Sequence, residues 1–304
     1  MLKLDLPQNY AWCKLLALYN DSHCREPTEF ADPKRGVLEG VVELPKPFWY
    51  HLEQAGQHLT LKLTAPDGAK PPTKADYTAA RAWATRRLWL DLDFAAMRAA
   101  LEVDFCGYNL VEAFYPVVPP AFSSYWSALL RIYGGRKFDG GLRATLADTV
   151  QFGGKAYPLL PSPEQMMTAI LETPKLGISG WTDRKIAHIT ETFLQRDDVQ
   201  LENLPSGPQA ALNRIVKRLE IGRSSAVWVL MRGAMHADVA LEGTGFRRAL
   251  GEAHGLPQPP APKAFGKLMQ AYAPYRSFAS YYLHLSNLRQ HRKHWLLDDT
   301  LEAN

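Results

Sequence analysis

The chain has few cysteines. Its 304 residues include only Cys13, Cys24 and Cys106, with no Cys-x-x-Cys pair among them. An odd and sparse set argues against a disulfide framework and against a zinc ribbon. No cysteine follows position 106, so the C-terminal part cannot supply a four-cysteine iron–sulfur cluster. We expect the protein to work in a reducing cytoplasm.

Long apolar runs and metal-binding motifs are also missing. No apolar run approaches the roughly 18 residues of a membrane-spanning helix, and the opening segment MLKLDLPQNYAW lacks the apolar centre of a signal peptide. The nine histidines form neither an HExxH motif nor a cluster of metal ligands. We therefore expect no membrane span, no export, no metal and no cofactor.

The composition is that of a globular protein with a mild basic bias. Hydrophobic residues make up 46% of the chain and charged residues 22%, and the formal net charge is +4. Between Ala211 and Leu250, basic residues outnumber acidic ones by seven to three. Such a segment suits an anionic partner, although a solvated helix face has the same composition.

The pattern of apolar residues changes partway along the chain. Before residue 118, short alternating runs predict an antiparallel sheet with a few helices. The breaker Pro119-Pro120 predicts a domain boundary, so we expect an α+β domain at 1–118 and a helical domain at 119–304. Strands are predicted at 2–6, 37–44, 48–53 and 58–64. Helices are predicted at 10–19, 73–88, 94–101, 122–132, 140–150, 163–172, 183–194, 207–219, 224–232, 245–253, 262–273 and 278–290.

A helix-turn-helix pattern lies at Arg218–Ala226. One helix ends there, Gly222 permits a tight turn, and Ser224 is expected to cap the next helix. The unpaired N–H groups at the start of that helix favour a phosphate oxygen, and such contacts carry no sequence information. An ordinary connection between two helices has the same pattern. The predicted DNA-binding residues are Ile221, Gly222, Arg223, Ser224 and Ser225.

Four further segments follow in order: Val229–Gly233, Ala237–Val239, Gly245–Leu250 and Pro274–Ala279. At this spacing, the region 121–290 resembles the helix-hairpin-helix DNA glycosylases of the 3-methyladenine DNA glycosylase II (AlkA-like) group. The resemblance implies a mainly α fold, with a bilobal helical domain beside an N-terminal α+β domain. It also implies a monomer that binds double-stranded DNA, flips a modified base and hydrolyses its N-glycosidic bond.

The family's catalytic aspartate stabilises the positive charge that develops on the sugar, but here that aspartate falls on Gly243 or Thr244. Glu242 lies one position away and is one candidate carboxylate. Asp238 is the other, although the resemblance assigns that position mainly to shaping the loop. A solvated acid near a helix N-terminus is the alternative interpretation of Glu242.

The predicted base pocket also departs from the family. The wedge pair corresponds to Gly135-Arg136, the aromatic after the hairpin to Ser224, and another pocket aromatic to His284, whereas Trp228 keeps an aromatic one turn later. We expect Arg136 to contact DNA. Smaller side chains at three of these positions predict an enlarged pocket for a bulky or hypermodified base, and a phage base would imply phage defence.

The position of the Schiff-base lysine of glycosylase-lyases holds Ser224 and Ser225, so no lyase step is expected. The leading hypothesis is thus a monofunctional DNA glycosylase. The missing aspartate leaves open a non-catalytic protein that binds DNA lesions or structures. A helical scaffold for a protein partner is the third hypothesis.

Overall fold

The computed structural model describes residues 1–8, 10–21, 28–102, 111, 114–137, 146–172 and 180–291. The strands are β1 (Leu2–Asp5), β2 (Phe30–Asp32), β3 (Val37–Glu43), β4 (Pro47–Ala55), β5 (His58–Thr64), β6 (Thr149–Phe152) and β7 (Lys155–Pro158). The helices are α1 (Trp12–Asp21), α2 (Lys74–Arg87), α3 (Phe94–Leu101), α5 (Tyr125–Lys137), α7 (Pro163–Glu172), α8 (Gly180–Gln195), α9 (Pro208–Leu219), α10 (Arg223–Arg232), α11 (Thr244–Ala253), α12 (Pro262–Met269) and α13 (Arg276–His291). Short 3₁₀ turns are η2 (Asp197–Val199), η3 (Leu201–Asn203) and η4 (Gln270–Tyr272).

The N-terminal unit is an antiparallel sheet in the order β1-β5-β4-β3-β2. Alternate residues of its central strands point to one face because side chains alternate along a strand. These residues are fully or almost fully buried: Phe48, Tyr50, Leu52, Leu59, Leu61 and Leu63. On this face Tyr50 meets Trp83 of α2 with ring centroids 4.9 Å apart. The alternation predicted from the sequence therefore produces the core of this unit.

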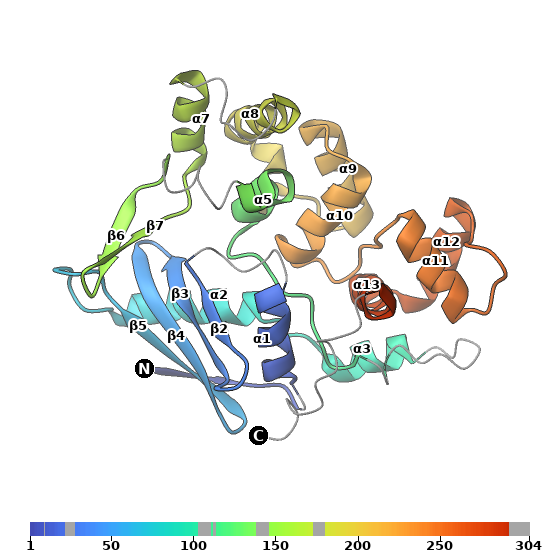
Figure 1. Cartoon of the computed structure of the whole chain (residues 1–304), viewed down its shortest axis with the longest axis horizontal. Coiled ribbons are helices and arrows are strands. Elements are labelled where there is room, and N and C mark those ends of the chain that lie inside the picture. Colours follow the sequence, from blue (N-terminus) through green and yellow to red (C-terminus); the bar gives the residue numbers. More distant parts are fainter. Residues whose placement is uncertain are drawn as a thin grey trace.

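The opposite face of the sheet is covered by the hairpin β6–β7 (Figure 1). Trp49 on β4 contacts Tyr157 and Phe152, with ring centroids 5.0 and 6.1 Å away. The turn is fixed by Asp67, whose carboxylate accepts the N–H groups of Gly154 and Gly153. These two hydrogen bonds lower the pKa of Asp67. The hairpin thus ties a segment beyond residue 118 to the N-terminal sheet.

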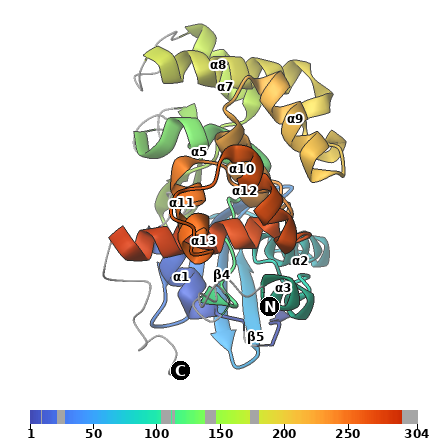
Figure 2. The ribbon, with the colours of Figure 1, turned by 90° about the vertical axis from the view of Figure 1, so that its right-hand side faces the viewer.

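The helices of the second half form two groups. In the first group α5, α7, α8, α9 and α10 pack against one another, and in the second α11, α12 and η4 lie with α13 (Figures 1 and 2). The first half of α13 is largely buried, and its Phe278 meets Trp89 of the N-terminal unit with ring centroids 4.9 Å apart. The described part of the chain contains no helix that is long and apolar enough to span a membrane. Within that part, no group of three or more His, Cys, Asp or Glu side chains is placed to hold a metal.

The predicted helix at 140–150 is wrong at its C-terminal end. Thr149 and Val150 belong to β6, and positions 140–145 lie outside the described residues. The turn Gly153-Gly154 has both φ angles positive, at 57° and 73°, which favours a tight hairpin. This glycine pair marks the strands β6 and β7 that the helical interpretation missed. The short edge strand β2 was also not predicted.

Candidate DNA interface and active site

The predicted hairpin is formed by α9, α10 and the turn between them. Helix α9 buries Ala211, Leu212, Ile215 and Leu219, whose spacing places them on one helical face. Helix α10 buries Ala226, Val229 and Leu230 among others, and Ile221 of the turn is 3% exposed. The apolar residues of this segment therefore hold the hairpin in place and leave the turn at the surface.

The turn differs from the sequence interpretation in one respect. The left-handed residue is Glu220, with φ of 48°, whereas Gly222 has φ of −61°. Gly222 is exposed, and a Cβ added there would meet nothing within 4 Å. The glycine is therefore not required by the backbone conformation. It leaves room for a ligand to approach the backbone closely.

The start of α10 carries no side-chain cap. Its N-cap is Gly222, so α10 begins one residue earlier than predicted, and the expected cap by Ser224 is wrong. The Ser224 hydroxyl instead donates to the carbonyl of Glu242, at 2.8 Å. The first N–H groups of α10 thus have no partner from the N-cap side chain. This is the arrangement in which a helix start binds a phosphate.

Arg223 and Glu242 form an ion pair at the base of the hairpin. The Arg223 Nε lies 3.3 Å from Glu242 Oε1, and an Arg223 Nη2 donates to the side-chain oxygen of Gln209, also at 3.3 Å. Both charged side chains are about two-fifths exposed. A surface pair of this kind contributes about 0–1 kcal/mol. Arg223 is therefore held by Glu242 here, and another anion can replace Glu242 at Arg223 at little cost.

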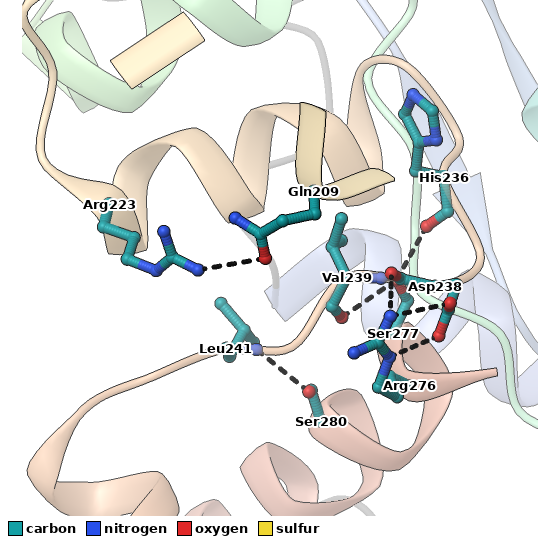
Figure 3. A network of polar contacts seen from close by, with 9 residues as sticks. All are labelled: Gln209, Arg223, His236, Asp238, Val239, Leu241, Arg276, Ser277 and Ser280. Carbon is teal, nitrogen blue, oxygen red and sulfur yellow. Dashed lines mark hydrogen bonds and ion pairs between the residues drawn. The ribbon is translucent and has the colours of Figure 1, made fainter. Parts of the chain in front are cut away.

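The stretch from Asp238 to Glu242 belongs to no helix or strand, and α13 binds two of its backbone N–H groups (Figure 3). Val239 and Leu241 are buried, and their N–H groups donate to the hydroxyls of Ser277 and Ser280, each at 3.0 Å. The two serines are three residues apart and share a face of α13. Asp238, Val239, Ala240 and Glu242 also line a hollow. The serine pair thus fixes the register of the stretch that carries both candidate carboxylates.

Asp238 is bound by Arg276 through two hydrogen bonds (Figure 3). The Arg276 Nε lies 2.5 Å from Oδ1, and Nη2 lies 2.8 Å from Oδ2. Both side chains are about four-fifths buried. The hydrogen bond to Asp238 raises the pKa of Arg276. Both oxygens of Asp238 are therefore engaged in holding the stretch to α13.

Gly243 faces an aromatic cluster, which we define as Trp228, Phe246, Tyr281 and His284. A Cβ added at Gly243 would lie 3.5 Å from the Phe246 ring, an ordinary contact. The His284 ring has its centroid 5.4 Å from that of Trp228, 6.0 Å from Phe246 and 6.1 Å from Tyr281. Glu242, one residue earlier, points into the hollow instead. The predicted pocket residues Trp228 and His284 thus lie together, and Gly243 adds no side chain beside the Phe246 ring of this cluster.

The hollow has a volume of about 330 Å³ and lies between α9, α12 and the 238–242 stretch. Its lining includes the cations Arg223, Lys263, Lys267 and Arg276, together with the carboxylates of Asp238 and Glu242. Both candidate carboxylates therefore lie in one hollow, each beside an arginine. Neither lysine had been identified from the sequence, because a pair spaced by four on an exposed helix is also typical of a solvated face.

Two predicted residues cannot be placed. Gly135 and Arg136 belong to the last turn of α5, but their side chains lie outside the described residues.

No family model and no curated protein matches the sequence. Several solved structures match its fold. The 3-methyladenine DNA glycosylase from Archaeoglobus fulgidus is 15% identical, with a TM-score of 0.71 over 97% of this chain and 100% of that protein. The chain has the fold of a DNA glycosylase. Similar folds are found in MBOgg1 in complex with a low-affinity DNA ligand, at 12% identity and a TM-score of 0.68 over 89% of this chain and 91% of that one. The Clostridium acetobutylicum 8-oxoguanine glycosylase/lyase bound to DNA is 10% identical, with a TM-score of 0.67 over 91% of this chain and 92% of its own.

The glycosylase fold includes the N-terminal α+β unit, since the first match spans nearly the whole chain. The mainly α fold with an N-terminal α+β part is therefore confirmed. The matched structures include a 3-methyladenine DNA glycosylase and an 8-oxoguanine glycosylase/lyase, so the fold is common to different base specificities.

Proposed function

We propose that this protein is a monofunctional DNA glycosylase that flips a modified base from duplex DNA and hydrolyses its N-glycosidic bond. The observation that carries the proposal is the position of the uncapped start of α10 within a glycosylase fold. The hairpin grips the backbone through N–H groups. The aromatic cluster, whose Trp228 lies further along α10, receives the flipped base by stacking.

Glu242 is the carboxylate that we assign to the chemistry. One of its oxygens pairs with Arg223 only loosely, whereas both oxygens of Asp238 are held by Arg276. A DNA phosphate that binds Arg223 releases Glu242, whose side chain then rotates toward the sugar beside Gly243. There its negative charge stabilises the positive charge that develops as the base leaves, and it orients the attacking water.

The substrate that we propose is a base larger than 3-methyladenine. Small residues at Gly135 and Ser224, and an imidazole at His284, provide less side-chain volume than the family's glutamine and aromatic residues. A bulky adduct or a hypermodified phage base suits such a pocket, and the second would make the protein a defence enzyme. The absence of a lysine at Ser224 and Ser225 supports hydrolysis without strand cleavage.

The test is a survey of released bases. Purified protein is incubated with alkylated, deaminated, oxidised and phage-modified duplex DNA, and free bases are identified by mass spectrometry. We expect one modified base to be released, with the strand left intact until alkali is added. Strand nicking before alkali, together with a borohydride-trapped adduct, would contradict monofunctional action. DNA binding without any base release would favour a non-catalytic lesion binder.

A further inference from the structure

The hollow beside the hairpin is rich in positive charge that the proposed chemistry does not use. Two of its four cations are already matched, because Arg276 pairs with Asp238 and Arg223 with Glu242. Lys263 and Lys267 remain. Both are exposed, and among the described residues no carboxylate lies within ion-pair distance of either. The hollow therefore keeps a net positive charge.

The two lysines are neighbours on one face of α12. Residues four apart on a helix are separated by about 6 Å along its axis. Like charges at this spacing destabilise a helix by about 0.2–0.5 kcal/mol. An anion bound between the two ammonium groups would attract both of them and so offset this repulsion. The spacing thus suits a bound phosphate group better than an empty surface.

Helix starts add to the positive charge of the hollow. Its lining includes Gln209, Arg223 and Lys263, which belong to the first turns of α9, α10 and α12. None of these three helices has a side-chain cap at its N-terminus. Uncapped first turns carry unpaired N–H groups and the positive ends of the helix dipoles. Three such turns and four cationic side chains converge on one hollow.

We propose that this hollow is a second backbone-phosphate site, in which Lys263 and Lys267 bind the DNA strand next to the phosphate held by the hairpin. The inference rests on the proposed function for the identity of the anion as DNA. Continuity with the hairpin favours a backbone phosphate over a free anion, because Arg223 stands both at the start of α10 and in the wall of the hollow. A phosphate in this site also competes with Glu242 for Arg223.

The experiment is a salt titration of binding to a short undamaged duplex. Lys263→Gln/Lys267→Gln is compared with the native protein and with Lys70→Gln/Lys74→Gln, a pair that removes the same charge from exposed positions of the N-terminal unit. Each lost phosphate contact lowers the slope of log affinity against log salt by about 0.9. We expect the slope to become less steep by about 2 in the α12 variant, and to stay native in the control. The control should melt at the native temperature, and the α12 variant no lower than that, because it loses the repulsion between its two lysines.

An unchanged slope in the α12 variant, or an equal change in the control pair, would overturn the proposal. Inorganic phosphate supplies a second arm. If phosphate displaces DNA from the native protein more strongly than chloride does at equal ionic strength, and the slope of the α12 variant is native, the hollow binds a free anion and the proposal fails. Base release is measured in parallel. Base release with a native slope contradicts only this site, whereas a reduced slope without base release contradicts only the proposed glycosylase activity.

Discussion

Arg276 holds both carboxylate oxygens of Asp238, at 2.5 and 2.8 Å, and so joins the start of α13 to the stretch that carries Glu242. Hydrogen bonds to charged groups contribute about 1.5–3 kcal/mol. We expect Asp238→Asn to lower the free energy of unfolding by about 2 kcal/mol, measured by urea denaturation. A double-mutant cycle with Arg276→Gln should show that the two effects are not additive. Simple additivity would contradict the assignment.

Ser277 and Ser280 accept the buried N–H groups of Val239 and Leu241. Replacing either serine by alanine leaves a buried donor without its acceptor, which costs about 1–3 kcal/mol. We expect both variants to unfold at lower urea concentration. Ser224→Ala is the matched control, because its hydroxyl is at the surface, and its effect should stay within about 0.5 kcal/mol. Equal losses in all three variants would show that the serines do not fix the register.

The stability of the chain should depend on pH through His236. Burial lowers the pKa of His236 in the folded protein, and burial lowers that of His254 as well. The unfolded chain therefore takes up these protons more readily, so stability is fully present above about pH 6.5 and falls as the pH drops below it. We expect His236→Gln to flatten this fall in urea midpoints. A fall as steep as in the native protein would contradict the role of His236.

Gly243 is the position at which a carboxylate would face the aromatic cluster. Its φ of 169° is extended backbone that any residue adopts, and a Cβ there makes only an ordinary contact with Phe246. Gly243→Asp should therefore fold normally. It should release the substrate base at least tenfold faster than the native protein, about 1.4 kcal/mol of added transition-state stabilisation. Gly243→Asn is the matched control. Equal rates in the two variants would show that position 243 does not face the sugar.

The sequence predicted the elements whose apolar spacing is regular. The strand at 58–64 and the helices at 94–101 and 163–172 have the predicted bounds, and the hairpin helices differ by a single residue at their starts. These segments bury one face, so local periodicity carries the information. The hairpin β6–β7 was missed because its burial depends on Trp49, a contact distant in sequence.

The site was predictable only in part. The order of motifs identified Trp228, His284 and both carboxylates, and the structure brings the two carboxylates into one hollow. The Arg276 partner of Asp238 and the two lysines of the hollow were not predictable, because they approach from helices distant in sequence. The serine pair at 277 and 280 left a signal that was missed, namely two hydroxyls on one face of the largely apolar segment Phe278–Leu283 and its start.

The central claim is that Glu242 supports base release by a glycosylase. The most direct measurement counts free bases and abasic sites produced from the identified substrate by the native protein, Glu242→Gln and Asp238→Asn, with DNA affinity measured alongside. The account predicts equal numbers of bases and abasic sites from the native protein, and loss of both in Glu242→Gln with DNA binding retained. Full activity in Glu242→Gln, or no base release by the native protein while it binds DNA, would contradict it.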